Sequence, residues 1–295
     1  MHDKHYKTGV VMILTATLCL SLGGLILRNM EAADGWQVMF YRSISFVVTL
    51  LALLVYRYRG GLLAAFRATG TDGVLVALFL AAGSICYLFS LLLTTVANAM
   101  FIIAATPLFV AVVAWLVIGE RVRPSTWAVM IVALCGIGLM VGDGLASGRV
   151  LGSVVALGVV VTFGGMIVVI RRSKAVDMLP ATCMAGVVGG AAAFFMAGDL
   201  EVSSHDLVLS LLMGSVQFGA GFALITMGTR HVPAAEVSLL SLLEPILASL
   251  WVWIFVNEVP ATLTLIGGAV VLGAVSCQAV AGLATAANVR RQSGG

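Results

Sequence analysis

Charged residues are scarce in this chain: aspartate, glutamate, lysine and arginine together make up 10% of its 295 residues. A soluble domain carries about 25% of them. Hydrophobic residues make up 61% of the sequence, and the mean hydropathy is +1.13. Because a soluble fold of this length could not bury so much apolar surface, the sequence indicates an integral membrane protein.

Motifs that carry enzymatic chemistry are absent as well. The sequence contains no Walker A loop, no His-Glu-x-x-His zinc motif and no Gly-x-Ser-x-Gly nucleophile motif. The four histidines lie in tails or at the ends of apolar segments, and the five cysteines lie inside such segments without metal-ligand spacing. We therefore expect no enzyme, no cofactor and no bound metal. The net charge of +3 gives no reason to expect a nucleic-acid partner.

Apolar stretches with few charges predict the membrane-spanning helices, each of which needs about 20 residues. The stretches are too long for the strands of a barrel and do not alternate. The stretch 73–119 is expected to form two helices, separated by a polar turn around Thr94, Thr95 and Asn98. Arg42 and Glu244 are the ionisable residues within spans. The ten expected spans are 8–27, 36–55, two within 73–119, 124–142, 150–170, 178–198, 207–229, 235–256 and 259–289.

Basic residues in the loops predict the orientation. If the N-terminus is cytoplasmic, most loop and tail Lys and Arg residues fall on the cytoplasmic side, and only Arg28 and Arg149 fall outside. We therefore predict that both termini are cytoplasmic. The cytoplasmic set is Lys4, Lys7, Arg57, Arg59, Arg67, Arg121, Arg123, Arg171, Arg172, Lys174, Arg230, Arg290 and Arg291.

The sequence contains the same pattern twice. Each copy is an apolar helix with a proline near its middle and an acid at its far end. Pro107 corresponds to Pro245, and Glu120 corresponds to Glu258, at the same spacing along the chain. Because five is an odd number, a second set of five helices must enter the membrane from the opposite side. The sequence therefore predicts two inverted repeats, an architecture common in secondary transporters.

Several of these features resemble the EamA repeat of the drug/metabolite transporter superfamily. They are the proline-centred helix, its Gly-Glu or Asn-Glu exit, a glycine-rich final helix at 131–142 and 265–280, and the Tyr41-Arg42 pair. The resemblance covers residues 8–284. Within the superfamily, the chain looks most like a bacterial inner-membrane exporter of aromatic amino acids.

The resemblance implies a basket of ten helices, with residues 1–146 as the first repeat and 147–295 as the second. Helices 1–4 and 6–9 would surround a central cavity. Helices 5 and 10 would lie apart as packing or dimer elements, which leaves a homodimer open. The second copy departs from the family pattern, because Asn257 replaces glycine and no basic residue follows Glu258.

Glu244 is the main candidate for a role in transport. An ionisable side chain in mid-membrane is costly, so it should face a cavity or a partner. It either recognises a substrate ammonium group or carries a proton, or it is protonated and bonds to backbone freed by Pro245. Thr106 occupies the corresponding place in the first copy, where its hydroxyl can bond to freed backbone in the same way.

Arg42 could neutralise a substrate carboxylate, or it could pair with an acid such as Glu31, Asp34 or Glu244. Its position near the start of its helix also lets the side chain reach the outer interface. We expect a structural or gating role rather than contact with substrate.

Five further residues are candidates for the wall of a cavity, or for packing alone. The first two share a helix face with Glu244, the third is the one large polar residue of its span, and the last two are aromatic. They are Ser241, Trp251, Gln217, Tyr87 and Phe163.

Two acids and two prolines are candidates for gating. Glu120 and Glu258 end their helices on opposite sides of the membrane, where each could pair with basic residues in one state or be solvated. Pro107 and Pro245 are expected to kink their helices and shape the cavity, and a hinge is a further hypothesis.

We therefore predict a secondary transporter that exports small organic metabolites by alternating access, with amino acids, including aromatic or bulky neutral ones, as substrates. Proton coupling is a further prediction, because Glu244 is the only acid in mid-membrane. Two alternatives stay open. One is a transporter of nucleotide sugars, sugar phosphates or vitamins, although phosphates would call for several buried basic groups and only Arg42 qualifies. The other is a non-transporting membrane partner protein.

Overall fold

The computed structural model describes residues 2–119, 124–146, 148–173, 176–229, 231–232, 237 and 240–293. Every regular element in these residues is helical. Seven helices are long and apolar enough to cross a membrane, and three shorter apolar helices bring the number to ten. The prediction of an all-α integral membrane protein with ten membrane helices is confirmed.

Several membrane helices consist of more than one element. The first is α1 (His2–Ser21) with α2 (Gly23–Arg28), the fourth is α6 (Val96–Ile103) with α7 (Thr106–Ile118), and the eighth is α11 (Ser204–Leu212), the π-helix η2 (Met213–Ala220) and α12 (Gly221–Gly228). The others are α3 (Gly35–Tyr58), α5 (Gly70–Leu93), α8 (Pro124–Ala146), α9 (Val150–Arg172), α10 (Leu179–Met196), α14 (Leu243–Val256) and α15 (Thr262–Ser293). A short 3₁₀ turn, η1 (Arg59–Gly61), and α4 (Leu62–Ala68) connect α3 to α5.

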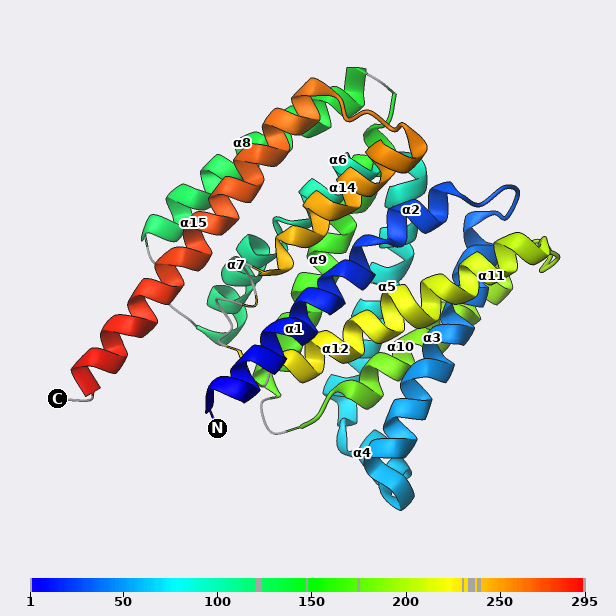
Figure 1. The fold of residues 1–295 in the computed structure, drawn as a ribbon, viewed down its shortest axis with the longest axis horizontal. Coiled ribbons are helices and arrows are strands. Elements are labelled where there is room, and N and C mark those ends of the chain that lie inside the picture. The colour runs from blue at the N-terminus through cyan, green and yellow to red at the C-terminus, as the bar shows by residue number, and fades with distance from the viewer. Residues whose placement is uncertain are drawn as a thin grey trace.

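The packing of the helices follows a two-fold pattern (Figure 1). The third membrane helix packs against the sixth and the seventh, as the eighth packs against the first and the second. The fourth packs against the sixth, as the ninth packs against the first. If each of the first five membrane helices is exchanged with the helix five positions later, each packed pair becomes the corresponding pair of the other comparison. The repeat boundary at residues 146–147 stays a prediction.

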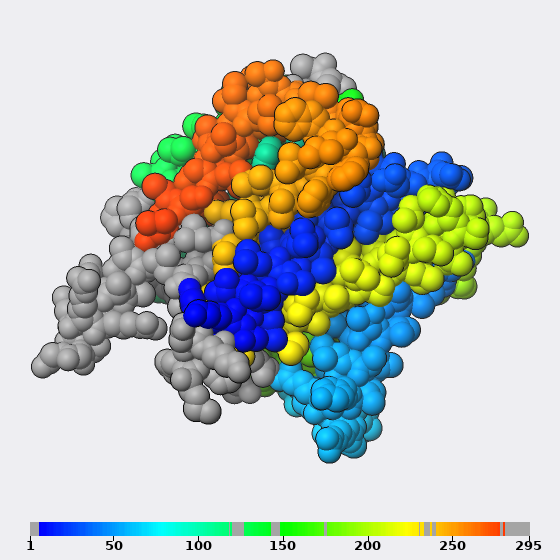
Figure 2. All heavy atoms as spheres, in the orientation of Figure 1, coloured from blue at the N-terminus to red at the C-terminus, as the bar shows by residue number. Residues whose placement is uncertain are grey.

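The fifth and tenth membrane helices, α8 and α15, pack against each other at one edge of the molecule (Figure 1). This is the separate place that the family resemblance implies for them. On the face shown in Figure 2, α1 and α2 lie between α14 on one side and α11–α12 on the other. α1 begins and α15 ends at the same end of the bundle.

The fourth and ninth membrane helices are interrupted just before their prolines. α6 ends at Ile103, and Pro107 lies in the first turn of α7. The described part of the ninth helix has a turn at Leu242, and Pro245 lies in the first turn of α14. Proline is tolerated in a first turn because its missing N–H would have no helical partner there. The distortion expected at each proline is therefore an interruption of the helix just before it, and a role of these interruptions in shaping a cavity stays a prediction.

Both half-helices end in a left-handed residue. Gly119 caps α7 with φ 77°, and Asn257 caps α14 with φ 58°. Asparagine is among the few residues besides glycine that adopt this conformation readily. The second copy therefore changes the residue type at this position and keeps the backbone conformation.

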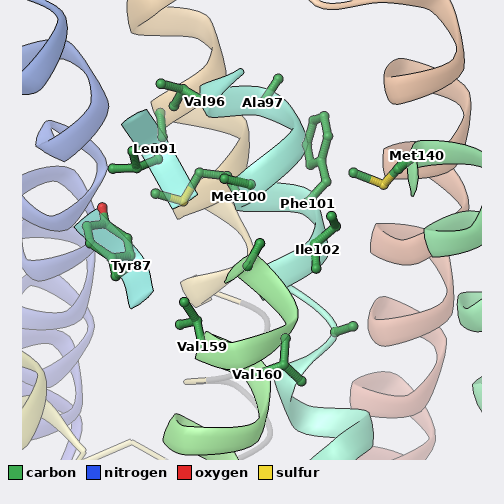
Figure 3. Packing of buried hydrophobic residues seen from close by; sticks show 14 of the residues in the cluster. Tyr87, Leu91, Val96, Ala97, Met100, Phe101, Ile102, Met140, Val159 and Val160 are labelled. Carbon is green, nitrogen blue, oxygen red and sulfur yellow. The ribbon is translucent and has the colours of Figure 1, made fainter. Parts of the chain in front are cut away.

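The larger apolar core cluster fills the space between α5, α6, α8 and α9 (Figure 3). Leu91, Met100, Ile102 and Val159 are 2% exposed or less. Tyr87 belongs to this cluster and lies at its edge, on the side of the first membrane helix (Figure 3). The apolar core thus ends at a polar hydroxyl in the interior of the protein.

Close contact between the second and eighth membrane helices depends on Gly214. A Cβ at this position would clash with the Arg42 carbonyl oxygen and the Ser45 hydroxyl. Gly214→Ala is therefore expected to lower the free energy of unfolding by about 1–3 kcal/mol, the usual cost of overpacking. Denaturant unfolding of the purified protein in detergent measures this. The matched control is Gly138→Ala in α8, where a Cβ meets nothing within 4 Å. Equal effects of the two changes would contradict the packing argument.

Candidate functional site

Polar and aromatic side chains from five membrane helices meet in the protein interior. All but the tryptophan of this central polar cluster are buried. A hydrogen bond, a ring contact and a shared approach to Gly23 link four of its residues, and the other two, Ser21 and Trp251, bond to each other two residues before Gly23 along the first membrane helix. The central polar cluster consists of Ser21, Arg42, Ser84, Tyr87, Gln217 and Trp251. Three of these, Tyr87, Gln217 and Trp251, are cavity candidates from the sequence.

Arg42 lies at one side of the central polar cluster and is only 1% exposed. Its guanidinium carbon lies 4.6 Å from the ring centroid of Phe218 and 5.9 Å from that of Tyr87. Nη2 donates a hydrogen bond to the Ser84 hydroxyl, whereas Nη1 has no hydrogen-bond partner in the described part of the chain. The expectation that Arg42 could extend to the outer interface is wrong, because the two rings hold the guanidinium between helices.

No acidic side chain of the described residues forms an ion pair with Arg42. The pairings considered from the sequence, with Glu31, Asp34 or Glu244, are not formed. Within these residues, Arg42 is therefore a buried cation whose hydrogen bonds and ring contacts come from neutral groups alone.

Two more buried polar atoms in the central polar cluster lack a partner among the described residues: the Tyr87 hydroxyl and Gln217 Oε1. Gln217 Nε2 donates to the Leu20 carbonyl at 3.1 Å. A Cβ on Gly23 would lie 2.6 Å from the Tyr87 hydroxyl oxygen and 3.1 Å from Gln217 Nε2. Buried polar atoms almost always find a hydrogen-bond partner, so three unpaired ones in one region make the central polar cluster the candidate site.

The π-helix η2 presents Gln217 and Phe218 to the central polar cluster. It interrupts the eighth membrane helix from Met213 to Ala220. π-helical turns are rare and occur often at functional sites. Phe218 was missed in the sequence, where it is one apolar residue among many, because nothing in the residue types of this segment predicts a π-helix.

Glu244 lies in the first turn of α14, next to the helix break. Its side chain is partly exposed and makes no hydrogen bond or ion pair with the described residues. An acid is favoured at a helix N-terminus by the helix dipole. The alternative in which Glu244 bonds to freed backbone is not formed in this structure.

Thr106 occupies the corresponding break in the fourth membrane helix. Its hydroxyl donates to the Ile103 carbonyl at 2.6 Å, which confirms that it can bond to the freed backbone. The two copies therefore treat the same helix break differently: one closes it with a hydroxyl, and the other leaves a carboxylate with no partner among the described residues.

The remaining cavity candidates take different places. Trp251 Nε1 donates to the Ser21 hydroxyl at 3.0 Å, which joins the ninth membrane helix to the first. Ser241 lies just before the break and is partly exposed. Phe163 packs tightly on Gly83 of α5. Roles of these side chains in the wall of a cavity stay predictions.

Glu258 forms a network at the end of the bundle opposite the termini. Its Oε2 accepts from Arg28 Nε at 2.6 Å, and its Oε1 accepts from the Val96 N–H at 2.7 Å. Arg28 Nη2 also donates to the Thr94 carbonyl at 2.9 Å. We call these four residues the Arg28–Glu258 latch, which joins the first, third, fourth and ninth membrane helices. The other acidic candidate, Glu120, lies outside the described residues.

Asp206 is a structural residue one position before the span expected at 207–229. It is completely buried and accepts hydrogen bonds at 2.9–3.0 Å from the backbone N–H groups of Glu31, Ala32 and Ala33. These bonds hold the segment that connects α2 to α3 against the start of the eighth membrane helix. Asp206 thereby holds the helix that carries Arg42 against the helix that carries Gln217.

The model of the EamA-like transporter family matches residues 7–142 and again residues 150–278. The chain belongs to the EamA-like transporter family. It is therefore a membrane transporter by family, and the resemblance seen in the sequence is confirmed.

Relatives of known function are distant. Pseudopaline exporter CntI from two Pseudomonas aeruginosa strains, UCBPP-PA14 and PAO1, is 26% identical to this EamA-like chain over an alignment of 284 positions. The alignment covers 93% of this chain and 96% of the exporter. One solved crystal structure of a protein has a TM-score of 0.65 and 21% identity, covering 92% of this chain and 97% of the other. At that identity, the likeness shows the fold alone.

Proposed function

We propose that this EamA-like protein exports small zwitterionic metabolites, most plainly amino acids with aromatic or bulky neutral side chains, by alternating access. The observation that carries the proposal is the central polar cluster, which offers a buried cation, Arg42, and aromatic rings. Glu244, at the break of the ninth membrane helix, adds a carboxylate that has no partner among the described residues. A zwitterion with an apolar side chain complements all three.

The broken helices support transport rather than enzymatic catalysis. Secondary transporters place their substrate near the midplane, at the ends of discontinuous helices. The two half-helices α7 and α14 begin at corresponding places in the two repeats. The likeness to a pseudopaline exporter supports export of small metabolites as the direction and the substrate class.

The structure favours a state closed at the end opposite the termini. There, α6 packs against α14, and α14 also packs against α2. The Arg28–Glu258 latch ties these elements together. α7, the other half of the fourth helix, packs instead against α9. Rocking of the two five-helix repeats, 1–146 and 147–295, would open the closed end.

The distribution of basic residues supports a location in a bacterial inner membrane with both termini cytoplasmic. Arg57, Arg171 and Arg172 lie at the end of the bundle where α1 begins, and Arg28 lies at the opposite end. The closed end would then face outward. The edge formed by α8 and α15 is the surface at which we would expect a homodimer.

Flux of labelled phenylalanine, leucine and alanine into proteoliposomes tests the proposed function. The purified protein is expected to raise uptake of at least the bulky amino acids above that of empty liposomes, and unlabelled substrate inside is expected to accelerate uptake by exchange. Sugar phosphates serve as the comparison substrate. Folded protein that moves no amino acid would overturn the proposal, and flux of sugar phosphates alone would favour the phosphate alternative.

A further inference from the structure

We propose that Arg42 and the small cavity beside it bind the carboxylate of the transported metabolite. This proposal rests on the proposed function, and it assigns contact with the substrate to a residue whose position near a helix end favoured a structural or gating role.

The burial of Arg42 gives the first argument. An ion moved out of water loses several kcal/mol of solvation, and proteins normally compensate with an opposite charge. The described residues supply none for Arg42, and one of its terminal nitrogens has no hydrogen-bond partner among them. Such an arrangement is costly in the empty protein, and an arriving anion would relieve that cost.

The cavity gives the second argument. It lies between α3, α5, α10 and η2 and is lined by Arg42, Ser43, Ser84 and Phe218 among others. In this state it has room for about one water molecule, so a substrate carboxylate would enter it as the surrounding helices move during transport. Ser43 and Ser84 add hydroxyl donors beside the guanidinium. A planar carboxylate with two acceptor oxygens suits such donors, because guanidinium binds carboxylates with two parallel hydrogen bonds.

Tyr87 gives the third argument, because it places a further unpaired polar group beside Arg42. Its ring centroid lies 5.9 Å from the Arg42 guanidinium carbon, and its buried hydroxyl has no hydrogen-bond partner among the described residues. Arg42 and Glu244 do not pair with each other. An α-amino acid carries its carboxylate and its ammonium on one carbon, so an amino acid bound at Arg42 keeps its ammonium free for an acceptor beyond the Tyr87 ring. The assigned pose places the carboxylate at Arg42 and the ammonium toward Glu244.

Competition in proteoliposomes tests the assignment. Phenylalaninamide keeps the ammonium and the ring of phenylalanine but replaces the carboxylate with a neutral amide. It is expected to compete about 10–100-fold less well than phenylalanine for uptake of labelled phenylalanine, since a hydrogen-bonded charge contributes a factor of this size. In Arg42→Gln this preference is expected to vanish, and in Arg42→Lys to be only partly retained. Arg149→Gln, at the start of α9, is the matched control and should keep the preference.

A binding measurement keeps the assignment testable even if phenylalanine is not transported. Phenylacetate is expected to raise the thermal unfolding temperature of the purified wild-type protein, and phenylacetamide is not. Arg42→Gln is expected to lose this response while its unfolding temperature without ligand does not fall. If Arg42 had only a structural role, Arg42→Gln would unfold at a lower temperature without ligand and would still be stabilised by phenylacetate. That result would overturn the assignment.

A third measurement, with chloride, distinguishes a site for a metabolite carboxylate from a site for an inorganic anion. If chloride stabilises the wild-type protein and phenylacetate neither adds to this effect nor competes with it, the site holds an inorganic anion and the carboxylate assignment is overturned. The assignment also fails if phenylalanine is transported but phenylalaninamide competes equally well, and in that case the proposed function still stands. Absence of any amino-acid flux, with the Arg42-dependent response to phenylacetate intact, would overturn the proposed function instead.

Discussion

Glu244→Gln is expected to reduce transport of zwitterionic amino acids by about 10–100-fold and to remove any response of the flux to a pH gradient. The amide keeps the size of the side chain but carries no charge. It cannot form the charge-assisted contact with a substrate ammonium, which is worth about 1.5–3 kcal/mol. It also cannot take up and release a proton. Because Glu244 makes no hydrogen bond or ion pair with the described residues, the fold should tolerate the change.

Two proteoliposome measurements separate the roles of Glu244. Flux at equal pH on both sides reports recognition of the ammonium group, and flux under an imposed pH gradient reports coupling. If Glu244→Gln loses only the response of the flux to the pH gradient, Glu244 carries a proton and does not recognise the substrate ammonium group. Glu31→Gln is the control, because this exposed acid in the connection from α2 to α3 bonds through its backbone alone. If Glu244→Gln transports like the wild type in both measurements, neither role holds.

Composition and repetition were enough to predict the architecture. Membrane helices have one simple requirement, a sufficiently long apolar stretch, so their number could be counted from charge-free runs. The spacing of Pro107 and Pro245 gave the repeat. The turn was predicted from polarity, and Thr94 and Thr95 separate α5 from α6 as expected, whereas Asn98, which was placed in the same turn, lies inside α6.

The details of the candidate site could not be predicted, because they depend on which helices pack together. The depth of Arg42 along its own helix indicated an interfacial position. Its burial follows instead from Phe218 and Tyr87, which two other helices contribute. The π-helix that presents Phe218 has no signature in residue type. Likewise, Asp206 looked like a loop acid until its three backbone donors came from a segment far away in sequence.

Removing the Arg28–Glu258 latch is expected to open the end of the bundle opposite the termini. In Glu258→Gln, the ion pair with Arg28 is lost and the charge-assisted cap on the Val96 N–H is weakened. The side chains of Arg28 and Glu258 are only 22% and 17% exposed, so solvent screens their interaction weakly. A loss of about 1–3 kcal/mol would shift the ratio of open to closed states by about 5–150-fold.

Thiol labelling from outside measures this shift. Ala97 is 1% exposed and lies in α6, one residue after Val96. In a background without the five native cysteines, Ala97→Cys should react with a membrane-impermeant maleimide at least about fivefold faster when Glu258→Gln is added. Arg28→Gln should act in the same way, and the double change should add little, because both break one network.

Asp177→Asn is the matched control for the latch. It breaks another short ion pair, between Arg57 and Asp177 at 2.6 Å, at the opposite end of the bundle. It is expected to leave the labelling rate at position 97 unchanged. If it accelerates labelling as much as Glu258→Gln does, the effect is general loosening of the bundle and the latch has no gating role. If only the changes at Arg28 and Glu258 accelerate labelling, closure of the end opposite the termini depends on this one network, and transport must break it in every cycle.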